Sequence, residues 1–424
     1  MQNFERYYKA VSFLEGLSNL PIEGDYMVRR SNLGVYLKKM RHFLKRIGNP
    51  DKGIKFIHIT GTAGKGSVTN MIHEVLNVSG INVGSFTSPF VTTSLEKIKV
   101  KDLYISPNEF ADIVDYLKPH LDKEYQHSPY GRPSYFELFL AIALVYFERK
   151  KCEWVVLEAG CGGRYDATNV IENPVITAIT NIDYDHMHIL GNTLRQIAYD
   201  KAGIIKKGCH FFTTEKRKAL LKIFSDVCDE NKVKLNNVSV SGDYQAQNIA
   251  LVQTVTQKLD INDECINKGI NKAHLQCRFE IMQQKPLVVL DGAHNRAKIR
   301  STVANLKKLN FRKLYLVIGM ADNKDGDSML EQIVPLADSV QVTRFQIKDR
   351  KCTHPKRLLA EVRTYLRKGV SVSLSLDPEV SLDKAIEKAG KSDLVLVTGS
   401  FFLVGELRKR WFSEEFILRK RKGL

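Results

Sequence analysis

The stretch from residue 54 to residue 80, IKFIHITGTAGKGSVTNMIHEVLNVSG, decides the fold predicted for this chain. It opens with a mostly apolar run of strand length, Ile54 to Ile59. Its last part repeats apolar side chains at the spacing of one helix face, at Val68, Met71, Ile72, Val75 and Leu76. Between them lies a glycine-rich turn with one lysine, Lys65. This order predicts a phosphate-binding loop, because glycines let the backbone approach an anion and a helix N-terminus directs N–H groups at it.

The turn does not fit the general P-loop pattern at two positions. Ile59 stands where the pattern has glycine, and Gly66 stands where it has a hydroxyl residue. The alternative interpretation is a glycine-rich turn with a solvated lysine. The strand before the turn and the helix after it favour the phosphate-binding loop, in which Lys65 would reach the terminal phosphates of a nucleotide.

Length and composition predict a globular protein of two or three domains. The chain has 424 residues, of which 43% are hydrophobic and 26% charged. Its longest apolar run, Leu138 to Phe147, is too short to cross a bilayer, and its first residues, MQNFER, lack the form of a signal peptide. The seven cysteines form no C-x-x-C pair. We therefore expect a protein of the reducing cytoplasm without a membrane partner.

The charge balance suits an anionic ligand. There are 64 Lys and Arg against 47 Asp and Glu, a net charge of +17. A generally basic surface accounts for most of these charges, and the run from 419 to 422 is expected to be a solvated end. Charge alone does not separate nucleotides, polyacids and nucleic acid as ligands.

Taken in order, the apolar pattern predicts two α/β domains. Helices are expected over 4–47 and 135–149, and strands over 81–86, 154–157 and 175–182. A second set of strands, separated by segments of helix length, is expected at 287–290, 314–318, 339–342, 370–374 and 394–397. The predicted fold is an N-terminal P-loop-type ATPase domain with a mostly parallel sheet, residues 1–282, and a C-terminal Rossmann-like doubly wound domain, residues 283–424.

Polar residues follow three of the predicted strands. Thr87 and Ser88 come after the first, Glu158 after the second, and Asp185 with His186 after the third. The carboxyl ends of parallel strands meet at one sheet edge, so these side chains are expected beside the phosphate-binding loop. Mg²⁺ needs few protein ligands besides water and phosphate. Any one of these residues alone would be better explained as a capped strand end or a hydrogen-bonded histidine. Polar residues at three successive strand ends instead predict a magnesium site.

Several longer motifs identify a family. They are GTAGKGS (61–67), TSPF (87–90), EAGCGGRYDATN (158–169), DH (185–186), DKAGIIK (200–206), LDGAHN (290–295) and VTGS (397–400). With these motifs in this order, the chain resembles the folylpolyglutamate synthase and dihydrofolate synthase family, a branch of the Mur ligases. The resemblance runs nearly end to end.

The resemblance implies a set of site residues. It places ATP phosphates on Thr62, Gly64, Lys65, Gly66 and Ser67, and a first Mg²⁺ on Ser88, Glu158 and His186. It implies further nucleotide contacts by Asn248, Arg278, Asp291 and His294, so that the nucleotide would bridge the two domains. In dihydrofolate-forming members the pterin substrate lies on positions that match Ser134, Tyr135, Phe136, Glu137, Tyr165, Asp166 and Ala167. The residues expected to be catalytic are Lys65, His186, Lys201, Asp291 and His294.

Lys201 is the least ordinary member of this set. The segment from Thr193 is predicted to be a helix, with Lys201 one turn beyond Ile197 and Ala198 on the same face. An unmodified ammonium would repel Mg²⁺, and most helix lysines are solvated. The resemblance implies that CO₂ carbamylates this lysine, which then binds a second Mg²⁺. A lysine in a low-dielectric, cation-rich site has the lowered pKa and neutral amine that this reaction needs.

The implied activity is an ATP-dependent ligation. ATP would phosphorylate a folate or dihydropteroate carboxylate, and the amine of L-glutamate would displace phosphate from the acyl phosphate. A monomer with no nucleic-acid partner is expected. Four residues depart from the family pattern: Ala63 replaces the usual asparagine, Phe90 takes a position often held by histidine, Cys277 replaces the usual glycine, and Arg296 replaces the usual proline. They leave substrate preference open.

A nucleic-acid-dependent P-loop ATPase is the alternative function, suggested by the net charge and the phosphate-binding loop. Such an enzyme would need a pair of carboxylates at a strand end and stretches that mix aromatic and basic residues. Glu158 is instead followed by Ala159 and Gly160. The sequence therefore favours the ligase.

Overall fold

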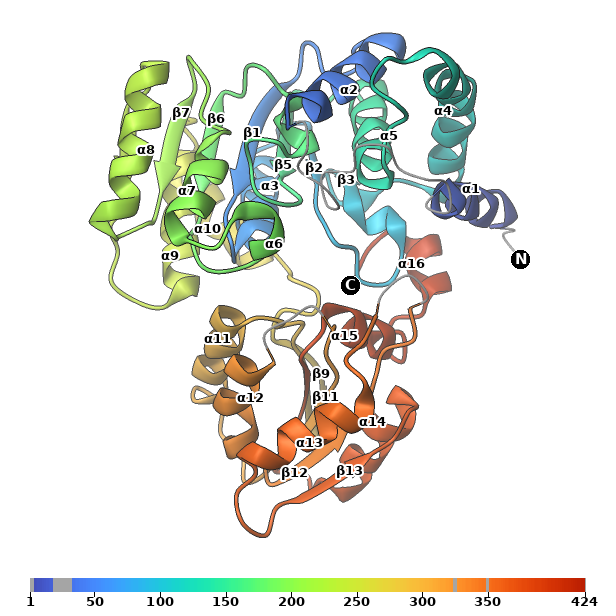
Figure 1. Cartoon of the computed structure of the whole chain (residues 1–424), viewed down its shortest axis with the longest axis vertical. Helices are drawn as coiled ribbons and strands as arrows, with labels where there is room; N and C mark the ends of the chain where they lie inside the picture. Colours follow the sequence, from blue (N-terminus) through green and yellow to red (C-terminus); the bar gives the residue numbers. More distant parts are fainter. Residues whose placement is uncertain (1–3, 18–32, 323–325, 348–350, 424) are drawn as a thin grey trace. The chain divides into compact units, whose positions relative to one another are not determined.

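The computed structural model describes residues 4–17, 33–322, 326–347 and 351–423. They form two compact units. Unit 1 comprises residues up to Phe90, Ser94–His274 and Lys420–Lys422, and unit 2 comprises Val91–Thr93, Leu275–Arg419 and the last two residues. Figure 1 shows the ribbon of both units, coloured along the sequence from blue at the N-terminus to red at the C-terminus. The middle of the helical segment predicted over 4–47 lies outside the described residues.

Unit 1 is built on a mainly parallel sheet. Its strands are β1 (Lys55–Thr60), β2 (Val83–Phe86), β3 (Ile98–Val100), β4 (Leu103–Tyr104), β5 (Trp154–Glu158), β6 (Ile176–Ile179), β7 (His210–Thr213) and β8 (Leu235–Asn237). In the described residues they run in the order β4-β3-β2-β5-β1-β6-β7-β8. Strands β2, β5, β1, β6, β7 and β8 are parallel, and only β3 and β4 run antiparallel to their neighbours.

Helices cover both faces of this sheet (Figure 1). They are α1 (Glu5–Gly16), α2 (Leu33–Arg46), α3 (Lys65–Val78), α4 (Pro107–His127), α5 (Tyr135–Arg149), α6 (Met187–Leu190), α7 (Leu194–Ala202), α8 (Lys218–Asn231), α9 (Tyr244–Gln257) and α10 (Asp263–Lys272), with short 3-10 turns η2 (Ser94–Lys97) and η3 (Ala167–Val170). Ile57 and Ile59 of β1 pack with α3, α9 and α10 on one face. Helices α7 and α8 pack on the other, against Ile179 and Phe211. Every residue of β1 after Lys55 is buried, and alternate side chains point to opposite faces, so Ile57 and Ile59 face α3, the helix that follows this strand.

Unit 2 is a second doubly wound sheet. Its strands are β9 (Glu280–Gln284), β10 (Leu287–Leu290), β11 (Leu314–Ile318), β12 (Ser339–Val342), β13 (Ser371–Leu374) and β14 (Leu394–Thr398), in the order β13-β12-β11-β14-β10-β9. Its helices are α11 (Arg296–Leu306), α12 (Asp327–Ile333), η4 (Val334–Leu336), α13 (Pro355–Tyr365), α14 (Pro378–Lys388), α15 (Phe401–Arg408) and α16 (Glu414–Lys420). The sheet of unit 2 has two hydrophobic cores. Helices α11 to α13 pack in one of them, and helices α14 and α15 pack in the other.

Two mainly parallel sheets, each with helices on both faces, confirm the predicted fold class. Helix α5 has the predicted bounds, because a Ser134–Glu137 capping box starts it where the apolar run begins. The strand predicted over 175–182 ends instead at Ile179, and the residues after it turn to hydrogen-bond with the β1–α3 loop. The antiparallel edge strand β9 was not predicted, and the domain boundary expected near 282 falls within it.

Among the described residues, no helix has both the length and the apolar character needed to cross a membrane.

Candidate active site

The predicted phosphate-binding loop joins β1 to α3. Gly64 precedes the first residue of α3 and has a φ of 83°, which glycine adopts without steric cost. Two amides earlier in the loop are already bound: the N–H of Thr62 donates to the Asn181 carbonyl at 2.9 Å, and that of Ala63 to Asn181 Oδ1 at 2.8 Å. The N–H groups at the start of a helix have no acceptor within the helix. The N–H of Val68 donates to the Gly64 carbonyl at 2.9 Å, so the loop offers a phosphate the amides of Lys65, Gly66 and Ser67.

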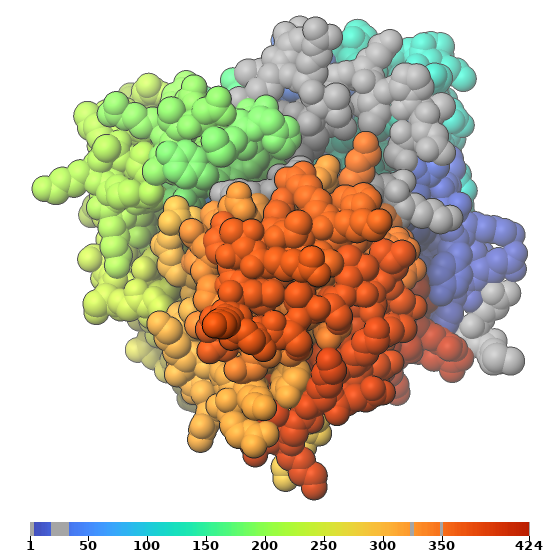
Figure 2. Space-filling model, turned by 60° about the horizontal axis from the view of Figure 1, so that its bottom comes forward, coloured from blue at the N-terminus to red at the C-terminus, as the bar shows by residue number. Residues whose placement is uncertain are grey.

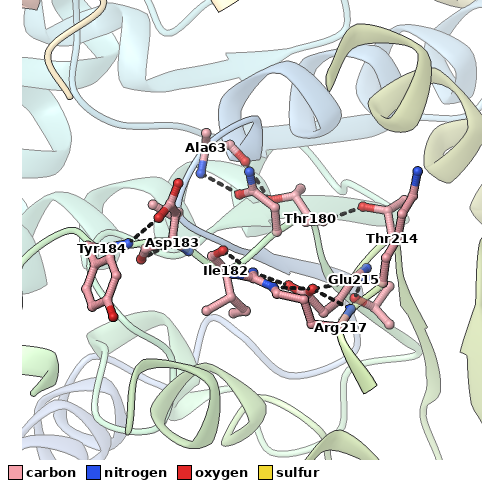
Figure 3. Close-up of polar contacts among 12 residues, drawn as sticks. Ala63, Thr180, Ile182, Asp183, Tyr184, Thr214, Glu215 and Arg217 are labelled. Carbon is pink, nitrogen blue, oxygen red and sulfur yellow. Dashed lines mark hydrogen bonds and ion pairs between the residues drawn. The ribbon is translucent and has the colours of Figure 1, made fainter. Parts of the chain in front are cut away.

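The residues after β6 hold this loop from the side (Figure 3). The Thr180 hydroxyl donates to the Ala63 carbonyl at 2.6 Å. The backbone of Thr180 is held in turn by the Thr214 hydroxyl, which donates to the Thr180 carbonyl. The N–H of Asp183 donates to the Thr62 hydroxyl at 2.9 Å. Sequence analysis missed these residues. Their only signal was a polar run directly after a buried strand, which does not show which loop it will contact.

An ion pair in the β7–α8 connection supports the same segment. Arg217 donates to the carboxylate of buried Glu215 at 2.8 Å and 2.7 Å, and also to the carbonyl of Ile182. Figure 3 shows Arg217 reaching across from Glu215 to Ile182. The loop that carries Asp185 and His186 is therefore tied at its start to two other parts of the sheet edge.

Two lysines meet at the carbonyl of Gly61. Lys65 Nζ lies 3.1 Å from this oxygen, and Lys201 Nζ lies 2.9 Å from it. Lys201 is 3% exposed, although it is a lysine on a helix. Burial, and then the charge of Lys65, lower the pKa of Lys201 to about 8. The predicted helix around Lys201 is confirmed as α7, which starts at a Thr193–Gln196 capping box.

The structure brings two of the predicted metal ligands together. Glu158 ends β5 and is buried, and its Oε2 accepts the N–H of Ser88 at 3.1 Å. A Cβ added to Gly66 would lie 3.3 Å from the same oxygen, so the carboxylate faces the phosphate-binding loop. His186 precedes α6 with a φ of 49°, and its backbone N–H donates to Asp185 Oδ1. The order β2-β5-β1-β6 places all these strand ends along one edge.

Mg²⁺ fits this donor set. A carboxylate and a serine lie next to a phosphate-binding loop, and Mg²⁺ favours a few hard oxygen ligands completed by water and phosphate. In the described ranges, no three His, Cys, Asp or Glu side chains gather as a group that could hold a metal ion. Serine, a modified lysine and nucleotide phosphates are further oxygen ligands that Mg²⁺ accepts.

Asn248, which sequence analysis assigned to the nucleotide, lies against the phosphate-binding loop. It sits in the second turn of α9, and a Cβ on Gly64 would come within 2.6 Å of its Oδ1. Helix α9 therefore brings this amide to the residue where α3 starts.

We expect Gly64→Ala to weaken nucleotide binding more than its backbone strain alone explains. The new Cβ would collide with the Asn248 amide, and either the loop or the amide would have to move. Gly80→Ala is the matched control, because Gly80 also has a φ of 83° but nothing within 4 Å of the added Cβ. Both variants should lose roughly 1 kcal/mol of stability. Titration with MgADP should show weaker binding for Gly64→Ala only; equal affinities would contradict the role of this contact.

The two segments assigned to the acceptor substrate meet at Gly160. A Cβ at Gly160 would lie 2.7 Å from the Phe136 ring and 3.2 Å from Asp166 Oδ2. Ala167 is buried directly after Asp166, and Tyr165 is half-buried directly before it. The predicted acceptor segments thus meet where the start of α5 packs against the loop that follows Glu158.

Several of these residues have internal partners as well. Asp166 Oδ2 accepts the N–H of Cys161 at 2.8 Å, and its Oδ1 accepts both the N–H and the hydroxyl of Thr168. Ser134 and Glu137 cap α5, and Glu137 pairs with buried Lys39 at 2.9 Å. The ring of Tyr135 lies 4.6 Å from Lys97 Nζ. Asp166, Ser134 and Glu137 therefore build the local structure, whatever else they bind.

Unit 2 gathers Arg278, Asp291 and His294. The Arg278 guanidinium lies over the Phe401 ring at 4.9 Å. Asp291 is buried and accepts the Thr302 hydroxyl at 2.6 Å; burial raises the pKa of Asp291, although Thr302 and Arg278 oppose that rise. His294 Nδ1 lies 2.8 Å from the Gly292 carbonyl, so it carries the proton.

Lys298 is a further residue here that sequence analysis missed. Its ammonium donates to His294 Nε2 at 2.8 Å, so His294 holds the neutral Nδ1-protonated form. Its only signal in the sequence was weak: Lys298 lies four residues after His294, in the first turn of α11.

The four departures have separate structural settings. The N–H and carbonyl of Ala63 are both bound, by Asn181 and Thr180, without a side chain at position 63. Cys277 is buried with a φ of 53°, the region that glycine favours, which gives a physical reason for the usual glycine there. Arg296 begins α11, where a proline also fits. The ring of Phe90 lies 5.2 Å from Lys97 Nζ.

Comparison with known proteins defines the class. The Mur ligase middle domain matches residues 59–277, and the Mur ligase glutamate ligase domain matches residues 277–401. A dihydrofolate synthase/folylpolyglutamate synthase of Bacillus subtilis is 32% identical over 414 residues, which cover 88% of this chain and 94% of that protein.

Solved structures agree with this class. Folylpolyglutamate synthase from Thermotoga maritima, 28% identical, superposes with a TM-score of 0.80 over 99% of this chain and 100% of its own. A bifunctional folylpolyglutamate synthase/dihydrofolate synthase with Mn, AMPPNP and L-glutamate bound has the same fold, with a TM-score of 0.80 at 24% identity over 95% of this chain and 97% of its own. The bifunctional folylpolyglutamate synthase/dihydrofolate synthase from Yersinia pestis also has this fold, with a TM-score of 0.80 at 24% identity over 95% of this chain and 98% of its own. The chain therefore belongs to the Mur ligase family, in its folylpolyglutamate synthase and dihydrofolate synthase branch.

Proposed function

We propose that this chain is an ATP-dependent ligase that adds L-glutamate to a folate or dihydropteroate carboxylate through an acyl phosphate. The observation that carries the proposal is the meeting of Lys65 and buried Lys201 at the Gly61 carbonyl, beside a loop that also faces Glu158. A phosphate-binding loop, a partly exposed lysine and a buried carboxylate at one sheet edge suit phosphoryl transfer, which needs positioning and charge neutralisation.

In the proposed reaction the phosphate-binding loop holds ATP by the amides of Lys65, Gly66 and Ser67. Lys65 would leave the Gly61 carbonyl and reach the terminal phosphates, where its charge stabilises the transferred group. The acceptor would lie along Tyr135, Phe136 and the loop at Gly160, with its carboxylate next to the phosphates. Attack by the glutamate amine on the acyl phosphate then forms the amide and releases phosphate.

Glu158, Ser88 and His186 are proposed to hold one Mg²⁺, and a carbamylated Lys201 a second. Mg²⁺ would neutralise charge on the phosphates and orient them. The buried amine of Lys201, with its pKa near 8, supports carbamylation because a substantial fraction is neutral near physiological pH. In unit 2, the proposed nucleotide contacts are Arg278, Asp291 and His294. The proposed domains are an ATP-binding domain, residues 1–282, and a ligase domain, residues 283–424. A cytoplasmic monomer stays a prediction.

Product formation with each acceptor tests the function. Dihydropteroate and a reduced folate would each be incubated with labelled glutamate, MgATP and the full chain. We expect ADP release that depends on both glutamate and acceptor, with label in the product. ADP release stimulated by DNA or RNA, without glutamate incorporation, would instead support the nucleic-acid-dependent ATPase. The acceptor that is consumed defines the substrate preference that the sequence leaves open.

A further inference from the structure

Arg278 is held in an unusual turn of unit 2. Its neighbours Cys277 and Phe279 have φ values of 53° and 51°, in the left-handed region that side chains with a Cβ rarely adopt. Such conformations persist only where the surrounding structure enforces them. Something must therefore hold the backbone on both sides of Arg278.

Hydrogen bonds from three directions fix the turn. The N–H of Cys277 donates to Glu280 Oε2 at 2.8 Å, and the carbonyl of Cys277 accepts the N–H of Gly292 at 2.8 Å. The N–H of Arg278 donates to the Leu275 carbonyl at 3.2 Å. The bond to Gly292 links this turn to the loop that carries Asp291 and His294.

The Glu280 carboxylate is in turn fixed by a buried arginine. Arg408 of α15 donates from Nε to Oε2 and from Nη2 to Oε1, both at 2.8 Å, and Nη2 also donates to the Gly423 carbonyl at 2.7 Å. The side chains of Arg408 and Glu280 are 0% and 2% exposed. A buried pair of this kind is weak evidence for stability, because desolvation opposes its attraction. Its two-point geometry does fix the direction of the carboxylate.

The same helix that carries Arg408 also supports Arg278 directly. Phe401 begins α15, and its ring lies under the Arg278 guanidinium. Helix α15 thus contacts Arg278 through a side chain at its start and holds the backbone around Arg278 through a side chain at its end.

We propose that Glu280 and Arg408 are positioning residues for nucleotide binding: they hold the strained turn at Cys277 so that Arg278 is presented to the nucleotide. The inference rests on the proposed function, in which Arg278 contacts ATP. It concerns this chain in particular, because glycine at position 277 would need no such restraint, whereas cysteine does.

The test combines loss of the pair with relief of the strain. Glu280→Gln should raise the Kd for MgADP about tenfold, because the carboxylate that receives both Arg408 and the Cys277 amide is lost. Adding Cys277→Gly should recover part of that affinity, since glycine adopts the turn without a Cβ. Calorimetric titration measures Kd independently of turnover, so it remains informative even if the wild-type chain adds no glutamate.

Asp393→Asn is the matched control. Asp393 is a buried carboxylate of the same unit that binds Arg312 and the N–H of Gly390, away from the turn. It should lower the melting temperature but leave MgADP affinity unchanged. If Glu280→Gln behaves like this control, or if Cys277→Gly recovers no affinity, the positioning role is wrong.

Arg408→Lys covers the case in which Glu280→Gln does not fold. Lysine keeps the buried charge but not the two-point fork. It should weaken MgADP binding, with recovery by Cys277→Gly; unchanged affinity would overturn the proposal.

Discussion

Glu158→Gln is expected to lower kcat for glutamate addition at least about a hundredfold, the scale on which removing one electrostatic stabiliser of a transition state acts. Glutamine keeps the shape of the side chain and can still accept the N–H of Ser88, but it lacks the negative charge proposed to hold Mg²⁺. The buried carboxylate faces Gly66, so its charge lies where the phosphates of ATP are expected. Steady-state ADP release at millimolar Mg²⁺ and a thermal melt measure activity and folding separately.

Glu124→Gln is the control for this variant. Glu124 is a fully buried carboxylate of the same unit, paired with His42 at 2.6 Å and Arg46 at 2.7 Å, and has no proposed part in the site. It should lose stability and keep its activity. A Glu158→Gln protein that retains most of its kcat at ordinary Mg²⁺ concentrations would rule out the metal-binding role.

Lys201→Ala is expected to be nearly inactive and to be partly rescued by short carboxylic acids. Its Nζ is buried at the Gly61 carbonyl, so alanine leaves space where a carboxylate can replace the carbamate. Lys201→Arg should stay inactive, because arginine is not carbamylated. Lys207→Ala is the control: Lys207 is exposed on the segment after the same helix and should keep full activity.

The proposed carbamylation of Lys201 should depend on pH. At constant dissolved CO₂, carbamylation should rise as pH increases through about 8, where the Lys201 amine becomes neutral. A lysine with its usual pKa would need a pH above roughly 10. Carbon-13 NMR with labelled bicarbonate should show a carbamate signal that Lys201→Arg lacks. Full activity of Lys201→Arg would exclude the modification as a requirement.

The fold class could be predicted because its signals are local. The apolar run, glycines and helical spacing between 54 and 80 correspond to β1, the turn and α3. The capping residues Ser134 and Thr193 start α5 and α7 at the predicted positions. Local periodicity does not show the antiparallel edge strand β9, because its residues, EIMQQ, are mostly polar and only partly buried.

By itself, the sequence determined the order of most strands and helices, the glycine-rich turn between β1 and α3, and the polar segments that follow the strands. Only the tertiary structure decided which of them meet. Lys201 reaches Gly61 across 140 residues, and Asn181 and Thr180 bind the backbone of Ala63. These contacts depend on the strand order β2-β5-β1-β6, which is not the order of the chain. Periodicity records the environment of one segment at a time, whereas strand neighbours are selected by the packing of the whole sheet.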